Sequence, residues 1–171
     1  SASTSKLMHP RRFLWELSQA LPEEAIVTTD IGNNSSMCNA YLKFKGTRQH
    51  LSALTWGNCG FAYGCAMGAK IGSPQAPVFA FQGDGAWGIS GLSEVMTAVR
   101  EEIPVIAIVV KNYEWGAEKK NQIDYYNNRF VGSNLPTNPD YARIAEDMGA
   151  RGYSIEHYGD VQDAVREAMA S

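Results

Sequence analysis

The segment VFAFQGDG, residues 78–85, joins a nearly continuous apolar run to a short turn of glycine and aspartate. A second apolar run, VIAIVV at residues 105–110, is followed directly by Lys111 and Asn112. Strands that are buried on both faces have this composition, which is typical of parallel sheets covered by helices. The sequence therefore predicts an α/β fold in three layers, with a mostly parallel sheet flanked by helices.

Weaker signals predict the remaining elements. We expect helices over residues 10–20, 35–44, 56–71, 89–101, 139–148 and 160–169, and further strands over residues 25–29, 51–55 and 152–156. Residues 117–138 are polar with little periodicity, so no element is assigned there. Residues 1–9 have no apolar signal core and are interpreted as a remnant of a tag or linker, which leaves residues 10–171 as one domain.

Composition narrows the possible classes of function. The 171 residues are 44% hydrophobic and 19% charged, which is typical of one globular domain. A net charge of −3 without a lysine and arginine cluster argues against nucleic-acid binding, and the apolar runs are too short to span a membrane. Cys38, Cys59 and Cys65 form no CxxC pair, and the three histidines are far apart in sequence. We therefore expect a reduced, cytoplasmic protein without a zinc site.

Asp84 and Asn112 each follow one of the two buried strands. The intervening residues are enough for one crossover helix, so the strands can be neighbours and the two side chains can lie side by side. Their oxygens, with a main-chain carbonyl, suit magnesium that also holds phosphate oxygens, and calcium is possible. Gly85 and Ala86 let the backbone approach an anion. Alone, the GDG turn would fit a helix cap, but its pairing with Asn112 favours a metal site.

The pattern of GDG, about 26 residues and then asparagine resembles the signature of thiamine-diphosphate-dependent enzymes, in their diphosphate-binding (PP) domain. The resemblance covers nearly the whole chain and implies the thiamin-diphosphate-binding fold. It also implies that Asp84, Asn112 and the main-chain carbonyl of Glu114 hold Mg²⁺. The family pattern has two consecutive asparagines, and Lys111 replaces the first of them. Because the second carries the metal ligand, the assignment of Asn112 is kept.

Two other segments match the same family. DIGNN, residues 30–34, occupies the turn that contacts the diphosphate, and GNCG, residues 57–60, resembles the loop that faces the aminopyrimidine ring. Cys59 would wedge the cofactor into its bent form, although a small buried thiol at a helix start fits the sequence equally well. The cofactor-binding residues implied by the resemblance are Gly32, Asn33, Asn34, Gly57, Asn58, Cys59, Gly83, Asp84, Gly85, Ala86, Asn112, Trp115 and Gly116.

A narrower resemblance concerns the substrate. GDGAWGIS at residues 83–90 and WGAEKKNQIDYY at residues 115–126 are similar to the sulfoacetaldehyde acetyltransferases. That family converts sulfoacetaldehyde and phosphate into acetyl phosphate and sulfite, which implies a small-molecule substrate and phosphate. Two alternatives stay open. One is an enzyme resembling acetolactate synthase or sulfopyruvate decarboxylase, and the other is a non-catalytic α/β module.

The resemblance also implies a missing part. The family activates its cofactor with a glutamate on a separate pyrimidine-binding (PYR) domain, usually from the neighbouring subunit. A second domain does not fit into 171 residues, so no catalytic residue is assigned to this chain. We interpret it as an excised PP domain or as one subunit of a split enzyme. The apolar surface that the partner domain would cover predicts association, as a homodimer.

Overall fold

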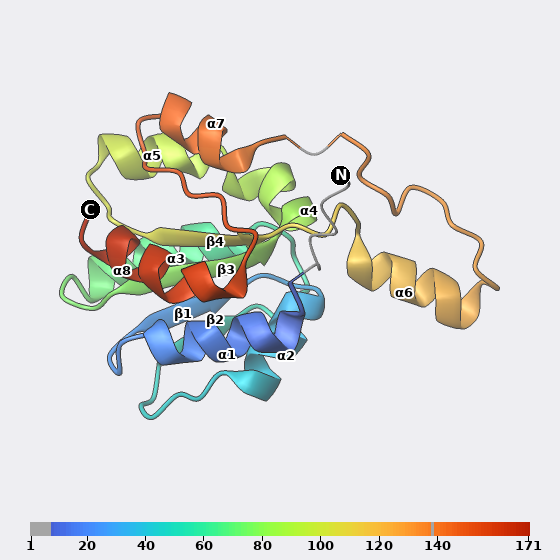
Figure 1. Cartoon of the computed structure of the whole chain (residues 1–171), viewed down its shortest axis with the longest axis horizontal. Helices are drawn as coiled ribbons and strands as arrows, with labels where there is room; N and C mark the ends of the chain where they lie inside the picture. Colours follow the sequence, from blue (N-terminus) through green and yellow to red (C-terminus); the bar gives the residue numbers. More distant parts are fainter. Residues whose placement is uncertain (1–7, 138) are drawn as a thin grey trace.

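The computed structural model describes residues 8–137 and 139–171, so the expected tag or linker at residues 1–9 lies almost wholly outside the described residues. Four strands form one parallel sheet in the order β2-β1-β3-β4 (Figure 1). Their bounds are β1 (Ile26–Thr29), β2 (His50–Ser52), β3 (Val78–Gly83) and β4 (Ile106–Val110). The predicted α/β class is confirmed, with every strand pair parallel.

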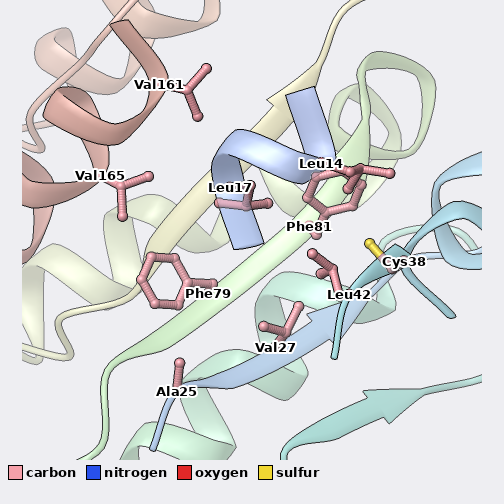
Figure 2. Close-up of a cluster of buried hydrophobic side chains, with 10 residues drawn as sticks. All are labelled: Leu14, Leu17, Ala25, Val27, Cys38, Leu42, Phe79, Phe81, Val161 and Val165. Carbon is pink, nitrogen blue, oxygen red and sulfur yellow. The ribbon is translucent and has the colours of Figure 1, made fainter. Parts of the chain in front are cut away.

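Alternation along β3 sends successive side chains to opposite faces of the sheet. Phe79 and Phe81 belong to a buried cluster with side chains of α1 (Pro10–Ala20), α2 (Asn33–Tyr41) and α8 (Val161–Met169) (Figure 2). Val78 and Ala80 belong to a second cluster with side chains of α3 (Phe61–Gly72) and α5 (Glu94–Arg100). Helices therefore cover both faces of the sheet, and the fold has three layers.

The helix α1 shows why the local sequence folds as predicted. Pro10 occupies its first turn, where a missing N–H group costs no hydrogen bond, and Nδ1 of His9 accepts the N–H of Arg11 at 3.3 Å. Leu14 and Leu17, three residues apart, point to the same side and are both buried against the sheet. Full burial of such a leucine contributes roughly 1.5–3 kcal/mol relative to an exposed one.

The helices expected over residues 35–44 and 56–71 correspond to α2 and to a shorter α3, which begins only at Phe61, and the strand expected over residues 51–55 is the shorter β2. Two other predicted elements differ more. The helix expected over residues 89–101 starts earlier and is divided into α4 (Asp84–Ala86), a π-helical turn η1 (Trp87–Gly91) and α5. The strand expected over residues 152–156 is wrong, because this segment follows α7 (Tyr141–Asp147) without joining the sheet. Gly152 lies against the main chain of Ala142 in α7, and Ile155 packs against the buried cluster around Phe79 and Phe81.

The stretch that received no element contains a helix, α6 (Gly116–Tyr125). It has no buried residue and projects beyond the ends of β3 and β4 (Figure 1). A helix without a buried face has no apolar stripe, so the periodicity that marks a helix in sequence is absent. Within residues 8–137 and 139–171, no helix combines the length and apolar character needed to cross a membrane.

Candidate functional site

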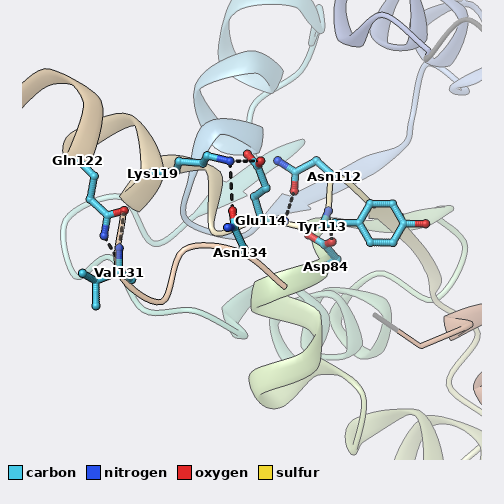
Figure 3. Close-up of polar contacts among 8 residues, drawn as sticks. All are labelled: Asp84, Asn112, Tyr113, Glu114, Lys119, Gln122, Val131 and Asn134. Atoms are coloured by element: carbon cyan, nitrogen blue, oxygen red, sulfur yellow. Dashed lines mark hydrogen bonds and ion pairs between the residues drawn. The ribbon is translucent and has the colours of Figure 1, made fainter. Parts of the chain in front are cut away.

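The carboxyl ends of β3 and β4 meet at one edge of the sheet. Gly83 is paired with Val110, so Asp84 and Asn112 leave the sheet from neighbouring strands. The carboxylate of Asp84, which is only 1% exposed, accepts the N–H of Gly85 at 3.1 Å and the N–H of Tyr113 at 2.8 Å (Figure 3). The second of these bonds links the end of β3 to the end of β4. Through this bond, the main chain of Tyr113, next to Asn112, contacts the carboxylate of Asp84.

Tyr113 turns the chain between Asn112 and Glu114. Its φ of +62° is in the left-handed region, which costs a non-glycine residue about 1 kcal/mol or more. The hydrogen bond from its N–H to the buried carboxylate of Asp84 offsets that cost. The same turn lets Oδ1 of Asn112 accept the N–H of Glu114 at 3.2 Å. The side-chain oxygen of Asn112 is therefore oriented by the main chain that follows it.

The main chain of Glu114 faces the same side. Glu114 forms an isolated antiparallel bridge with Asn134, in which the N–H of Trp115 bonds the carbonyl of Ser133 at 2.8 Å and the N–H of Leu135 bonds the carbonyl of Tyr113 at 2.7 Å. In a pair of this kind the bridged residue keeps its own N–H and C=O directed away from the partner segment. The N–H of Glu114 points to Asn112, as described above, so its carbonyl is directed to that side as well.

Glycines bring the three predicted diphosphate segments into contact, because a Cβ at each would collide with a side chain from another segment. The collisions, at 2.8–3.1 Å, are Gly83 with Asn34, Gly85 with the ring of Trp115, and Gly116 with Asn33 and Asn112. The turn at residues 30–34, the GDG turn and the loop at residues 112–116 thus form one cluster. Ala86, 5% exposed, ends α4 behind it.

Three helix starts lie in this cluster. The helices α2, α4 and α6 begin at Asn33, Asp84 and Gly116, and none of the three has a hydrogen-bonding side-chain cap. Gly32, with a φ of +120°, makes the turn into α2. Uncapped N–H groups at a helix start carry partial positive charge and bind anions such as phosphate. The edge of the sheet therefore combines main-chain N–H groups of a kind that suits an anion with oxygen atoms of a kind that suits a cation.

The loop at residues 57–60 is fixed by Asp30, a residue that the sequence analysis treated only as part of a turn. Its fully buried carboxylate accepts the N–H of Gly60 through both oxygens, at 2.9 and 3.0 Å, and the N–H of Ala62 at 3.3 Å. Burial raises the pKa of Asp30, while hydrogen bonds from the main chain of residues 60–62 and Ile31 act in the opposite direction. The sequence signal that could have identified Asp30 is an acidic residue directly after the carboxyl end of a buried strand, β1.

The outer part of this loop is less enclosed. Asn58 is exposed, and Gly57, with a φ of +62°, lies near the side chain of Ile31. Cys59 is half-buried, and burial raises its pKa, with smaller contributions from the charges of Asp30 and Glu118. A raised pKa keeps the thiol neutral, which suits packing against a ligand better than nucleophilic attack.

A loop and α6 form an arm beside the cluster. The side chain of Lys119 contacts Glu114 and donates to Oδ1 of Asn134 at 3.2 Å, at the base of the arm (Figure 3). Farther out, the side chain of Gln122 bonds both main-chain groups of Val131. These contacts hold the bridge on which the orientation of Glu114 depends. In the described part of the chain, no three His, Cys, Asp or Glu side chains gather as a metal site.

A polar network, largely buried, connects α2 to the strands β1 and β2. Oγ1 of Thr29 lies 3.1 Å from Nε2 of His50 and 3.3 Å from Oγ of Ser35, which lies 3.0 Å from Oγ of Ser52. The ring of His50 stacks on Phe44 with centroids 5.1 Å apart. Burial lowers the pKa of His50 from its ordinary value of 6.5, because the charged imidazolium loses hydration.

The lowered pKa of His50 predicts how stability depends on pH. The unfolded chain takes up the proton before the folded chain does, so this contribution to the free energy of unfolding is complete above about pH 6.5. It is lost as the pH falls through the lower, folded-state pKa. Thermal unfolding from pH 7.5 to 5 should show a smaller loss of stability in His50→Gln than in the parent chain. Equal pH profiles for the two proteins would contradict this assignment.

The fold and the site define a class of protein: a parallel α/β domain whose polar turns gather at the carboxyl ends of its strands. Residues 30–171 match the family model described as thiamine pyrophosphate enzyme, C-terminal TPP binding domain. The chain belongs to this family. The match covers most of the chain and all the segments of the cluster described above.

Curated relatives and a solved structure agree with the family. The chain is 48% identical to sulfoacetaldehyde acetyltransferase of Castellaniella defragrans and 44% identical to a probable sulfoacetaldehyde acetyltransferase of Rhizobium meliloti, in each case over 95% of this chain and 27% of the relative. It is 30% identical to a probable acetolactate synthase large subunit of Methanocaldococcus jannaschii, over 97% of this chain and 29% of the relative. The chain thus spans about a quarter of the length of these relatives.

The solved structure supports the fold. A thiamine diphosphate-dependent 4-hydroxybenzoylformate decarboxylase of Rhodococcus jostii matches with a TM-score of 0.86 and 23% identity, over all of this chain and 32% of that one. The thiamin-diphosphate-binding fold implied by the sequence motifs is therefore confirmed.

Proposed function

We propose that residues 10–171 form the diphosphate- and magnesium-binding domain of a thiamine-diphosphate-dependent enzyme. One observation carries the proposal: Asp84, Asn112 and the main chain of Glu114 converge at the ends of two neighbouring strands, linked by the hydrogen bonds of Tyr113 and Glu114. One carboxylate, one amide oxygen and one carbonyl are ligands that Mg²⁺ accepts, with the remaining positions left for phosphate oxygens and water.

The residues present fit the cofactor as well as the metal. The uncapped starts of α2, α4 and α6 lie in one cluster and suit a diphosphate. A side chain at Gly83, Gly85 or Gly116 would push apart segments that have to meet there. The loop at residues 57–60 is held at Gly60 by Asp30, and its exposed part is open to the aromatic end of a ligand.

Each of the proposed site residues then has a role in holding the metal or the cofactor. The cofactor, when bound, supplies a nucleophilic thiazolium carbon that adds to a carbonyl group. Asp84, Asn112 and the carbonyl of Glu114 hold Mg²⁺, which neutralises and positions the diphosphate. The other diphosphate contacts come from the turn at residues 32–34, the backbone of residues 83–86, and residues 115 and 116. Gly57 and Asn58 orient the aminopyrimidine ring, and Cys59 packs against the cofactor.

We further propose that the whole enzyme is a sulfoacetaldehyde acetyltransferase. The relatives with 44–48% identity support this assignment, as do the segments at residues 83–90 and 115–126. An acetolactate-synthase-like activity is the second candidate, because relatives with that name match at 28–30% identity. The activating glutamate would come from a PYR domain or subunit, within a cytoplasmic homodimer.

Calorimetric titration tests the binding function. Thiamine diphosphate added to this chain should release heat only when Mg²⁺ is present, and weakly, because the PYR side of the cofactor site is missing. The matched control is thiamine, which lacks the diphosphate and should release no measurable heat. Folding of the protein is verified by circular dichroism. If the folded chain releases no heat with thiamine diphosphate and Mg²⁺, the proposed binding function is rejected, and the non-catalytic α/β module is the remaining hypothesis.

A further inference from the structure

Lys111 occupies the position where the family pattern has its first asparagine, and the structure gives it specific partners. Its ammonium group donates to the carbonyl of Pro139 at 2.8 Å. The same group lies 5.2 Å from the ring centroid of Tyr113 and 5.7 Å from that of Tyr141. Lys111 therefore joins the end of β4 to the segment that leads into α7. Aromatic faces and a carbonyl are favourable surroundings for a cation.

Tyr141 continues the connection from α7 to the GDG turn. Its hydroxyl donates to the main-chain carbonyl of Asp84 at 3.2 Å, and a Cβ on Gly88 would lie 3.2 Å from that hydroxyl. The carbonyl of Asp84 also accepts the N–H of Trp87.

These contacts hold Asp84 from two directions. Gly85 and Tyr113 donate to its side chain, while Tyr141, in α7, donates to its main-chain carbonyl. The residue is thereby fixed at both ends of its Cα–Cβ bond. Lys111 adds to this because it fixes the segment that carries Tyr141 and covers the ring of Tyr113, whose N–H bonds the carboxylate.

We propose that Tyr141 and Lys111 are positioning residues for the metal ligands: they fix the orientation of Asp84 without touching the ion. This inference rests on the proposed function, because it requires that Asp84 binds a divalent cation. It also explains the departure from the family pattern at residue 111. A lysine there reaches Pro139 and Tyr141, and it leaves the ligand position at Asn112 unchanged.

The test measures metal affinity separately from stability and from turnover. Mn²⁺ is titrated into this chain with saturating thiamine diphosphate, and the free ion is followed by electron paramagnetic resonance. We expect Tyr141→Phe and Lys111→Met each to raise the Mn²⁺ concentration at half-saturation roughly fivefold, the effect of losing one hydrogen bond in a binding site. Lys111→Arg, which keeps the charge and the donors, should restore affinity to within about twofold of the parent.

The matched control variants remove a tyrosine hydroxyl or a lysine ammonium group at positions outside the proposed site. Tyr158→Phe deletes a half-exposed hydroxyl, and Lys43→Met deletes an exposed ammonium group. Both should bind Mn²⁺ like the parent chain. Thermal unfolding without metal is measured for every variant, and the titrations are run well below the lowest transition.

Each outcome has a defined meaning. Lower melting temperatures with parental Mn²⁺ affinity would show a purely structural role and overturn the inference. Equal losses of affinity in the control variants would overturn it as well. If the folded parent chain binds no Mn²⁺ with thiamine diphosphate, the proposed function fails and the inference fails with it. Parental binding with unchanged affinity in Tyr141→Phe and Lys111→Met rejects the inference alone.

Discussion

Replacing Asp84 with asparagine is expected to weaken Mg²⁺-dependent binding of thiamine diphosphate by roughly a hundredfold or more. The substitution preserves the size of the side chain but removes the only carboxylate among the proposed ligands. It also places an amide NH₂ opposite the N–H of Gly85 or Tyr113, where the carboxylate accepts both. The loss is measured by calorimetry with and without Mg²⁺.

Stability has to be separated from binding in this experiment. Asp84 is buried, so an unpaired donor there costs about 1–3 kcal/mol of folding stability. Asn112→Ala removes a second proposed ligand of the same site. Because the side chain of Asn112 is exposed, its loss should affect folding little, but it should also weaken binding strongly. Asp147→Asn, an exposed position on α7, is the matched control with unchanged binding. If Asp84→Asn is folded and binds like the parent, Asp84 is not a metal ligand.

The chain on its own is expected to produce no acetyl phosphate from sulfoacetaldehyde and phosphate. The site described here contains groups for binding and orientation, while the proposed activating glutamate belongs to a PYR domain. Addition of such a domain, as a separate polypeptide or in a longer chain, should produce turnover where there was none. Acetyl phosphate formation is followed with both components, with each component alone, and with Asp84→Asn in place of the parent chain.

The reconstituted enzyme also distinguishes the candidate substrates. Sulfoacetaldehyde with phosphate should be the preferred pair, and pyruvate with a second pyruvate should react slowly or not at all. A preference for two pyruvates would favour the acetolactate-synthase-like alternative. Full-rate acetyl phosphate production by the 171-residue chain alone would refute the requirement for a partner domain.

Much of the site was predictable because its residues follow two apolar strands, β3, which is buried, and β4, which is half-buried. The apolar runs ending at Gly83 and Val110 identify two strands, which are neighbours in the sheet, and parallel strands place their carboxyl ends together. That rule is sufficient to bring Asp84 and Asn112 to one edge. The strand predicted over residues 152–156 failed because alternation of Tyr153 and Ile155 with polar or small residues has the period of a strand whether or not the segment pairs with a sheet.

The positioning groups were not predictable in the same way. Asp30 sits in a turn motif, and its role depends on Gly60 and Ala62, thirty residues away in sequence. The contact of Tyr141 with the carbonyl of Asp84 spans nearly sixty residues. Hydrogen bonds between distant segments leave no periodic pattern in the sequence, since they depend on how helices pack on the sheet.

Sequence alone was sufficient for the fold class, for the polar turns that follow β3 and β4, and for the residue types suited to a cation and an anion. Local hydrophobic periodicity and chain connectivity determine these features. Only the tertiary structure decided that Glu114 turns its main chain toward Asn112, that Asp30 anchors the loop at residues 57–60, and that α6 forms without a buried face. These features depend on which segments meet across the sheet, and that pairing is set by packing of the whole domain.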